Sequence, residues 1–171
     1  ASISNEFQYK GFNFKFLLNY AGGHSVIDRW AFVYDNDGAF ANLNHLASNL
    51  YDSWTPDNRD ASRPQYLFNS DNNSSSSNST RYIYDADHIR LRSVELGYKL
   101  DAELLKGVNW VSDVYVYVRG LNVYTWVFDD DLYFDPEVGS NEFNTSLEGA
   151  GVYDQSAPNL KQFLFGVNVN F

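Results

Sequence analysis

The densest group of charged side chains in this 171-residue sequence lies between positions 129 and 137, where five carboxylates occur within nine residues. Clusters of carboxylate oxygens are the ligands that calcium takes in proteins. The spacing differs from that of an EF-hand loop, however, and an acidic surface loop is commonly only solvated. Two interpretations stay open, a solvated loop without any cofactor and a calcium site whose ligands would be Asp129, Asp131, Asp135 and Glu137.

Three arginines form a second group that could bind a polar ligand. Arg90 and Arg92 are two residues apart, so in an extended strand their side chains project from the same face. Arg119 lies on the next predicted strand. Guanidinium groups bind carboxylates and other anionic or polar groups through charge-assisted hydrogen bonds. We expect these residues to bind a polar ligand or to pair with acidic loops, and ion pairing is the interpretation that we favour.

Aromatic residues supply the third candidate site. Two long segments without a regular pattern, at about 21–81 and 127–158, carry many aromatic residues, and Trp126 directly precedes the second. Such rings can stack on sugar rings or anchor a binding surface. The alternative is that they pack the loops together or against a partner protein. The candidate ligand-binding aromatics are Trp30, Trp54, Tyr66 and Trp126.

No pattern in the sequence indicates catalysis or nucleic-acid binding. His24, His45 and His88 are isolated, without HExxH spacing or a nucleophile–base pair. The absence of cysteine removes disulfide and thiolate chemistry. The formal charge of −10 opposes binding to phosphate groups, which needs a basic face. We therefore expect neither enzymatic activity nor a nucleic-acid partner.

Alternating apolar and polar residues predict the elements that position these side chains. In the segment from Phe12 to Tyr20 every second residue is apolar or aromatic, which is typical of a strand with one apolar and one polar face. A short helix is predicted near 43–50, and the low-complexity tract at 70–79 cannot bury apolar surface. The five predicted strands cover about 2–9, 12–20, 82–100, 110–126 and 159–171.

The connections between these strands alternate in length. A two-residue turn, Lys10-Gly11, and a short connection with one helical turn at 102–106 alternate with loops of about 60 and about 30 residues. Outer-membrane barrels have this asymmetry. The chain is 18% aromatic and lacks the apolar run of about 20 residues that a membrane helix needs. These features predict an all-β fold, a transmembrane antiparallel β-barrel. A soluble sheet with one wet face is the alternative.

Several motifs resemble those of SusC-like (RagA-like) TonB-dependent outer-membrane transporters. Residues 87–100, DHIRLRSVELGYKL, resemble the family stretch YLRLKNLTLGYTLP, although the proline is missing. VRGLNVYTW at 118–126 resembles GQNLFTFT, FDPEVG at 134–139 resembles YDPEVG, and WTPDN at 54–58 resembles part of RWTPENPNAxYPR. The aromatic Phe171 at the end of an alternating strand resembles the signal that the outer-membrane assembly machinery recognises.

This resemblance implies a plugged barrel of 22 strands, of which the chain would supply the last five. It implies TonB-dependent import of oligosaccharides or peptides, contact with lipid, and a SusD-like lipoprotein as a lid. TonB would act through a plug region that these residues do not include. Counting strands back from a periplasmic C-terminus places the protein as a multi-pass wall in the bacterial outer membrane, with both long loops extracellular.

Two other functions remain open from the sequence. One is a SusC-like barrel that serves as a structural or assembly component of an outer-membrane complex after losing transport. The other is a secreted carbohydrate-binding β-sandwich. The sequence predicts neither the substrate nor the oligomeric state, and it leaves open whether the preceding strands belong to the same polypeptide.

Overall fold

The computed structural model of the chain describes residues 1–40, 42–68, 79–100, 110–138 and 151–171. The predicted helical turn at 102–106 lies outside the described residues, as does all of the serine-rich tract except Ser79. By its internal contacts the chain forms two compact units. The first contains residues 1–24, 85–137 and 158–171, and the second contains residues 25–84 and 138–157.

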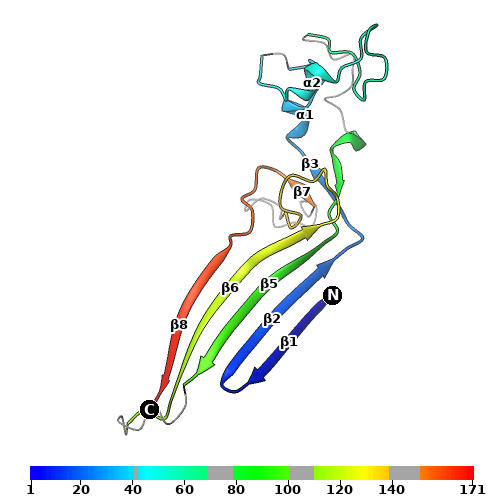
Figure 1. Cartoon of the computed structure of the whole chain (residues 1–171). Coiled ribbons are helices and arrows are strands. Elements are labelled where there is room, and N and C mark those ends of the chain that lie inside the picture. The colour runs from blue at the N-terminus through cyan, green and yellow to red at the C-terminus, as the bar shows by residue number, and fades with distance from the viewer. Residues whose placement is uncertain (41, 69–78, 101–109, 139–150) are drawn as a thin grey trace. The chain divides into compact units, whose positions relative to one another are not determined.

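The first unit is one antiparallel sheet, and Figure 1 shows its five strands side by side in a single layer. Strands that follow one another in this unit are also neighbours in the sheet, in the order β1-β2-β5-β6-β8. This meander confirms the all-β fold class that the alternation predicts, as an open part of a barrel wall. The strands are β1 (Ser2–Tyr9), β2 (Phe12–Ala21), β5 (His88–Lys99), β6 (Asp113–Val127) and β8 (Gln162–Asn170).

The first hairpin has the tight turn that its sequence favours. Tyr9 pairs with Phe12, so only Lys10 and Gly11 lie between the strands. Both have positive φ, 44° and 83°, which is the conformation of a type I′ turn. The Lys99 backbone N–H donates to the Gly11 carbonyl at 2.8 Å, which ties the turn to the next strand of the sheet.

The cross-strand register gathers apolar residues of all five strands on one face. Phe7 pairs with Phe14, Phe14 with Leu96, Leu96 with Val118, and Val118 with Phe165. Four of these five side chains are exposed, and only Val118 is half-buried. A soluble sandwich would bury such a row against a second sheet. The exposed row therefore contradicts the sandwich alternative within the part of the chain that the structure describes.

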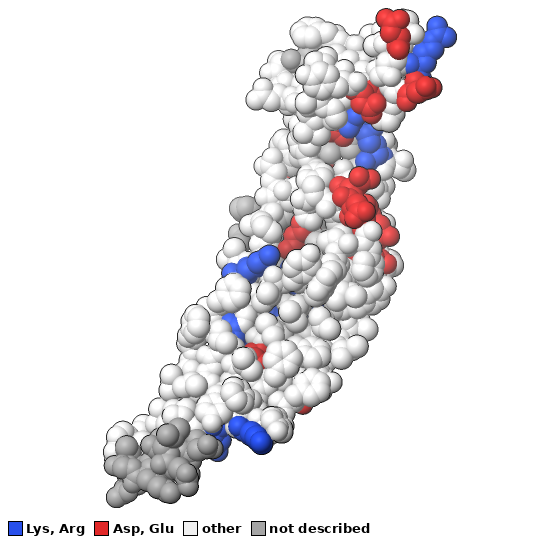
Figure 2. All heavy atoms as spheres, in the orientation of Figure 1, with Lys and Arg blue, Asp and Glu red and all other residues white. Residues whose placement is uncertain are grey.

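The opposite face carries a row of alternating charges, one residue along each strand from the apolar row. Glu6 pairs with Lys15, Lys15 with Glu95, and Glu95 with Arg119. The Lys15 ammonium lies 3.3 Å from Glu6, and the Arg119 Nε donates to Glu95 at 2.7 Å. In the view of Figure 2, charged side chains are sparse over the strands. One face of the sheet is thus polar and internally paired, and the other is apolar.

The third predicted strand is too long, because the structure divides it. The pattern predicts one strand over 82–100, whereas β4 (Ile83–Asp85) belongs to the second unit's sheet and β5 begins at His88. Between them the Asp87 N–H donates to the Asp85 carboxylate at 2.9 Å, and the Ala86 N–H donates to the His24 carbonyl at 3.1 Å. Such local hydrogen bonds compete with the ladder of a sheet and end the strand. The fourth and fifth strands are also shorter than predicted at their starts.

The second unit contains a small sheet in the order β4-β3-β7, with β3 (Ser25–Asp28) and β7 (Val152–Tyr153) paired in parallel. The helix predicted near 43–50 is shorter and begins later, as α2 (Ser48–Tyr51). A further helix, α1 (Ala31–Tyr34), and a 3₁₀ turn, η2 (Thr80–Tyr82), precede and follow it. None of the described helices has the length and apolar character that a membrane-crossing helix requires.

Buried polar contacts hold the second unit together. Asp35 pairs with Arg63, and the fully buried Asp37 pairs with Arg81 at 3.0 Å. The Tyr82 hydroxyl donates to the Asp35 carbonyl at 2.8 Å, and burial raises the pKa of Tyr82 to about 12. The loop segments around residues 35, 63 and 81 are therefore joined through charges and hydrogen bonds. Among the described residues of this unit, few large apolar side chains are buried.

Candidate functional site

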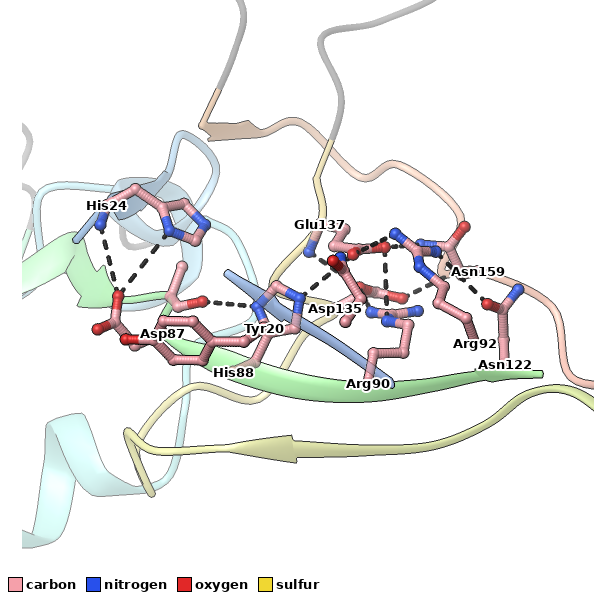
Figure 3. Close-up of polar contacts among 12 residues, drawn as sticks. Tyr20, His24, Asp87, His88, Arg90, Arg92, Asn122, Asp135, Glu137 and Asn159 are labelled. Atoms are coloured by element: carbon pink, nitrogen blue, oxygen red, sulfur yellow. Dashed lines mark hydrogen bonds and ion pairs between the residues drawn. The ribbon is translucent and has the colours of Figure 1, made fainter. Parts of the chain in front are cut away.

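An ion-pair cluster occupies the polar side of β5 at the end where the sheet leads into the long loops (Figure 3). Arg90, only 2% exposed, pairs with Asp135, and its Nε lies 3.4 Å from Glu137 Oε2. The Arg92 guanidinium lies 2.5 Å from Glu137 Oε1. The strand places both arginines on one side, and the carboxylates come from the segment that follows β6. The cluster thus ties this loop segment back onto the strand.

The far end of the same loop joins the cluster at Asn159. Its backbone N–H donates to Asp135 Oδ2 at 2.9 Å, and its side-chain amide donates to Glu137 Oε2 at 3.1 Å. The Glu137 N–H in turn donates to Asp135 Oδ1 at 2.9 Å. The two carboxylates therefore hold the start and the end of the loop against one strand.

His88 completes the cluster, although the sequence pattern predicts an isolated histidine. Its ring is fully buried, with Nδ1 2.8 Å from the Ala86 carbonyl and Nε2 3.2 Å from Glu137 Oε1. Both ring nitrogens thus face oxygen acceptors. A neutral imidazole can donate to only one of them, and a doubly protonated ring can donate to both. The signal that would have found His88 is its spacing, because positions 88, 90 and 92 alternate along one strand.

The structure brings Arg90 and Arg92 together with acidic loop residues, as the favoured interpretation of the sequence predicts. Arg119 differs from them. Its guanidinium pairs with Glu95 on the adjacent strand, and Glu95 also accepts a hydrogen bond from the Tyr115 hydroxyl at 3.0 Å. Arg119 therefore contributes to the polar face of the sheet and takes no part in the loop cluster.

The candidate aromatic residues do not form one site. Trp30 lies in the second unit, where its Nε1–H donates to Asp154. Trp54 is 39% exposed in the same unit, and the Tyr66 ring lies edge-on to His45 at 5.9 Å between centroids. Trp126, the fourth candidate, ends the strand predicted over 110–126, and the structure places it within β6.

Trp126 belongs to β6 and lies on the apolar face of the sheet. It pairs with Ile89 across the strands, and its ring contacts that of Tyr124 at 4.7 Å between centroids. The two-residue period places both rings on the side opposite Arg90. Trp126 is therefore separated from the polar cluster by the sheet itself.

Three of the four candidate calcium ligands use their carboxylates on other partners. Asp135 and Glu137 pair with arginine, whereas Asp129 accepts hydrogen bonds from the backbone N–H groups of Asp85 and Asp131, each at 2.9 Å. Within the described residues no group of three or more His, Cys, Asp or Glu side chains could hold a metal ion. The geometry therefore gives the calcium site no support, and it stays a prediction.

The pKa of Asp135 shows how the cluster compensates burial. Burial opposes ionisation of this carboxyl, but hydrogen bonds from the Arg90 guanidinium and from the N–H groups of Glu137 and Asn159 outweigh it. The pKa of Asp135 consequently lies below its ordinary value. The carboxylate stays ionised, and the ion pair with Arg90 is kept at neutral pH.

Acid should release this loop segment. Because the pKa of Asp135 is lower in the folded than in the unfolded loop, its ion pair stabilises the fold above the unfolded value of about 3.9. That stabilisation is lost as the pH falls through the folded-state pKa. We expect the hydrogen-exchange protection factor of the Glu137 amide to be constant from neutral pH to about 5 and to fall below about 4. The Asp135→Asn variant should lack this step, and an equal step in both proteins would contradict the assignment.

Together, the exposed apolar face, the polar face and the loops fixed at one end define a wall segment of a β-barrel membrane protein. Comparison with curated proteins agrees with this class. TonB-dependent receptor P26 of Formosa agariphila is 31% identical over 172 residues, which is 99% of this chain and 16% of the receptor. TonB-dependent receptor P39 of the same organism is 27% identical over 177 residues, again 16% of its length. No protein-family profile matches the chain.

Solved structures show the same likeness. The RagAB peptide importer in its open-open state superposes with a TM-score of 0.79 at 25% identity, over 99% of this chain and 17% of that one. Its closed-closed state gives a TM-score of 0.75. The resemblance found in the sequence is thereby confirmed: over nearly its whole length this chain is similar to a part of TonB-dependent receptors and of the RagAB importer. It spans about a sixth of the length of these relatives, which are receptors and transporters and not enzymes.

Proposed function

We propose that the protein carrying this chain is a TonB-dependent importer of peptide or oligosaccharide nutrients in the bacterial outer membrane. These residues form part of its barrel wall and two of its extracellular loops. The observation that carries the proposal is the exposed apolar row that runs from Phe7 to Phe165 across all five strands, opposite a polar row. A barrel wall needs this division because lipid contacts one side and a polar lumen the other.

Peptides are the substrate class that the solved structures favour, because the superposing importer is described as a peptide importer. The resemblance to SusC-like transporters supports a SusD-like lipoprotein lid above the long loops and energy supplied by TonB. The alternation of short and long connections supports extracellular loops and a periplasmic C-terminus. The polar cluster on β5 would then hold one extracellular loop against the rim of the barrel.

A charge placed on the apolar face tests the membrane wall. An arginine that faces lipid near the bilayer midplane destabilises a barrel by about 2–4 kcal/mol, whereas one that faces the lumen is tolerated. We expect Leu96→Arg in the full-length receptor to reduce the heat-modifiable, folded protein in outer-membrane fractions at least tenfold. Asn168→Arg, on the polar face opposite Tyr115, should leave the amount unchanged. Equal tolerance of both variants would contradict a lipid-facing row.

Transport itself is tested by uptake in cells that carry the folded receptor. Fluorescent oligopeptides and oligosaccharides of similar size should be taken up at different rates. Uptake of the preferred class should be abolished when the proton-motive force is collapsed. Energy-dependent uptake of neither class, with the receptor folded in the outer membrane, would favour the structural or assembly function instead. Preference for oligosaccharides would correct the substrate class and leave the transport proposal intact.

A further inference from the structure

The alternation of faces along β5 changes phase at one point in the strand. Phe16 pairs with Val94, and Leu18 pairs with Leu91. Phe16 and Leu18 are two residues apart on β2, so both lie on the apolar face. Val94 and Leu91 share that face because cross-strand partners lie on the same side of a sheet, although they are three residues apart. The residue that the register skips is Arg92.

This change of phase brings the ion-pair cluster to the polar face of the sheet. From the skipped residue toward Lys99, the odd-numbered residues of β5, such as Glu95, lie on the polar face. From there toward His88, the even-numbered residues, such as Arg90, lie on it. An unbroken alternation that kept Glu95 on the polar face would turn Arg90 to the apolar face. The cluster therefore depends on the phase change.

Strand β6 follows the phase change with a bulge of its own. Two of its residues, Asn122 and Val123, stand opposite the single Arg92. Asn122 has φ of 50°, within the left-handed region that the first residue of one type of bulge adopts. Val123 lies beside Gly120, where an added Cβ would come within 2.5 Å of the valine Cγ2. The bulge thus needs a residue that tolerates positive φ and a residue without a side chain, and the motif VRGLNVYTW at 118–126 supplies both.

The bulge keeps β6 in phase with β5. Regular pairing continued from Val94 and Gly120 would set Tyr124 opposite Arg90, an aromatic ring beside a charge that needs carboxylates. With the extra residue, Tyr124 pairs with Leu91 instead. The apolar row and the charged row of the two strands therefore stay on their own faces beyond the bulge.

The side chain of Asn122 joins the bulge to the ion-pair cluster. Its Oδ1 accepts a hydrogen bond from Arg92 Nη1 at 3.4 Å (Figure 3), and its Nδ2 donates to the Leu160 carbonyl at 3.2 Å. Leu160 directly follows Asn159, whose backbone and side-chain N–H groups hold the carboxylates of the cluster. Asn122 thus contacts the arginine side of the cluster and the end of the loop that the cluster holds.

We propose that Asn122 is a positioning residue for the loop that follows β6, because the bulge that it forms keeps the ion-pair cluster on the lumen side of the wall. The inference rests on the proposed function, since only in a barrel does the polar face border a lumen. Asn122 acts through Arg92 and through the register of the two strands. Its backbone conformation matters more than its two side-chain hydrogen bonds, which are long and lie partly in solvent.

Spin labels in the full-length receptor, reconstituted in proteoliposomes, test the phase change directly. Leu91 and Ser93 are two residues apart, so an unbroken alternation places both on one face, whereas the register places them on opposite faces. Leu91 is eight residues from Lys99, about 20 Å along the membrane normal at a tilt near 40°, which lies within the apolar band of about 25 Å.

The measurement is the accessibility of each label to oxygen, which enters lipid, relative to a water-soluble nickel complex. This ratio should be at least fivefold higher for Leu91→Cys than for Ser93→Cys. Val94→Cys and Leu96→Cys are the matched control pair, because they are also two residues apart but no phase change lies between them. Both control labels should report lipid.

Hydrogen exchange of residues 128–137 in the same receptor tests the role of Asn122. A β-branched residue does not tolerate a positive φ, so Asn122→Val should raise the exchange rate at least tenfold. Asn122→Gly keeps the backbone conformation and should raise the rate at most threefold. Asn168→Val is the same substitution on the polar face of β8, at a position without positive φ, and should leave the rate unchanged.

If Asn122→Val fails to fold, the label pair and Asn122→Gly still decide the proposal. Equal environments at Leu91 and Ser93 would overturn the phase change. Equal exchange in Asn122→Val and Asn168→Val, or an Asn122→Gly variant with a tenfold rise, would overturn the positioning role of the backbone at Asn122. Control labels that report water in the folded receptor would instead contradict the membrane wall, and with it the proposed function.

Discussion

Arg90→Ala is expected to detach the loop that follows β6 from the sheet and to destabilise this region by about 3–5 kcal/mol. Arg90 is 2% exposed and contacts both Asp135 and Glu137. Its removal leaves two largely buried carboxylates close together without their main cation. The cost is therefore larger than that of a missing contact, because uncompensated buried charge is added. Hydrogen exchange of residues 128–137 in the full-length receptor should rise by at least a hundredfold.

Two comparison variants separate this explanation from a general loss of arginine. Arg29 is 63% exposed and lies 3.9 Å from Asp154, so Arg29→Ala should change stability by less than about 1 kcal/mol. Combining Arg90→Met with Asp135→Asn and Glu137→Gln removes the charges of Arg90 and of both carboxylates, leaves only the one-third-exposed Arg92 charged, and should restore much of the protection. If Arg90→Ala behaves like Arg29→Ala, or if the triple variant is as mobile as the single one, the cluster does not hold the loop.

The cluster explains how a long polar loop can be positioned at the edge of a barrel wall without an apolar core. Asp135 and Glu137 lie two residues apart, and each uses both carboxylate oxygens, on the strand and on Asn159. The burial of Arg90 makes these contacts strong, since water screens them little. The described ends of this loop are thus fixed at the end of the sheet, which agrees with the proposed place of the loop at the rim of the barrel.

Alternation along the strands predicts most of the sheet and the pairing of Arg90 with loop carboxylates. It fails where a residue's environment is set by distant parts of the chain. His88 is missed because its partner Glu137 lies 49 residues away. The third strand is predicted too long because the pattern continues through Asp87, where side-chain hydrogen bonds end the ladder. Trp126 is grouped with the loop aromatics as a candidate ligand-binding residue, although it ends the predicted fourth strand and its parity with Tyr124 places it on the apolar face.

Alternation in the sequence does not predict the second unit, and the physical reason is different. Its strands β3 and β7 have four and two residues, which is too short for a period to be visible. Its stability comes from buried polar pairs such as Asp37 with Arg81, and the members of each pair are far apart in the sequence. A unit with this kind of interior has little capacity to adjust around an added group, since each polar contact depends on its geometry.

A single methyl group at Gly38 should therefore disrupt the second unit. Gly38 has φ of +104°, and a Cβ there would lie 2.3 Å from the Leu67 carbonyl oxygen and 2.7 Å from its carbon. These are backbone atoms, held in place by the Leu67 N–H, which donates to the Asp37 carbonyl at 3.0 Å. The unfavourable φ costs about 1–2 kcal/mol and the forced displacement about 1–3 kcal/mol more. In the full-length receptor, Gly38→Ala should speed tryptic cleavage after the exposed Arg59 at least tenfold.

Gly151→Ala is the matched control within the same unit. Gly151 also has a positive φ, +80°, but among the described residues a Cβ there would meet only the Ser25 carbonyl oxygen, at 3.1 Å. In this variant the positive φ is still unfavourable for alanine, but few neighbouring atoms have to move. Cleavage after Arg59 should therefore rise only a few-fold. Folded receptor in the outer membrane should be unchanged for both variants, because neither alters the strands of the wall. Equal cleavage of the two variants would show that the Leu67 backbone yields to the methyl group, and it would contradict a rigid, polar-paired second unit.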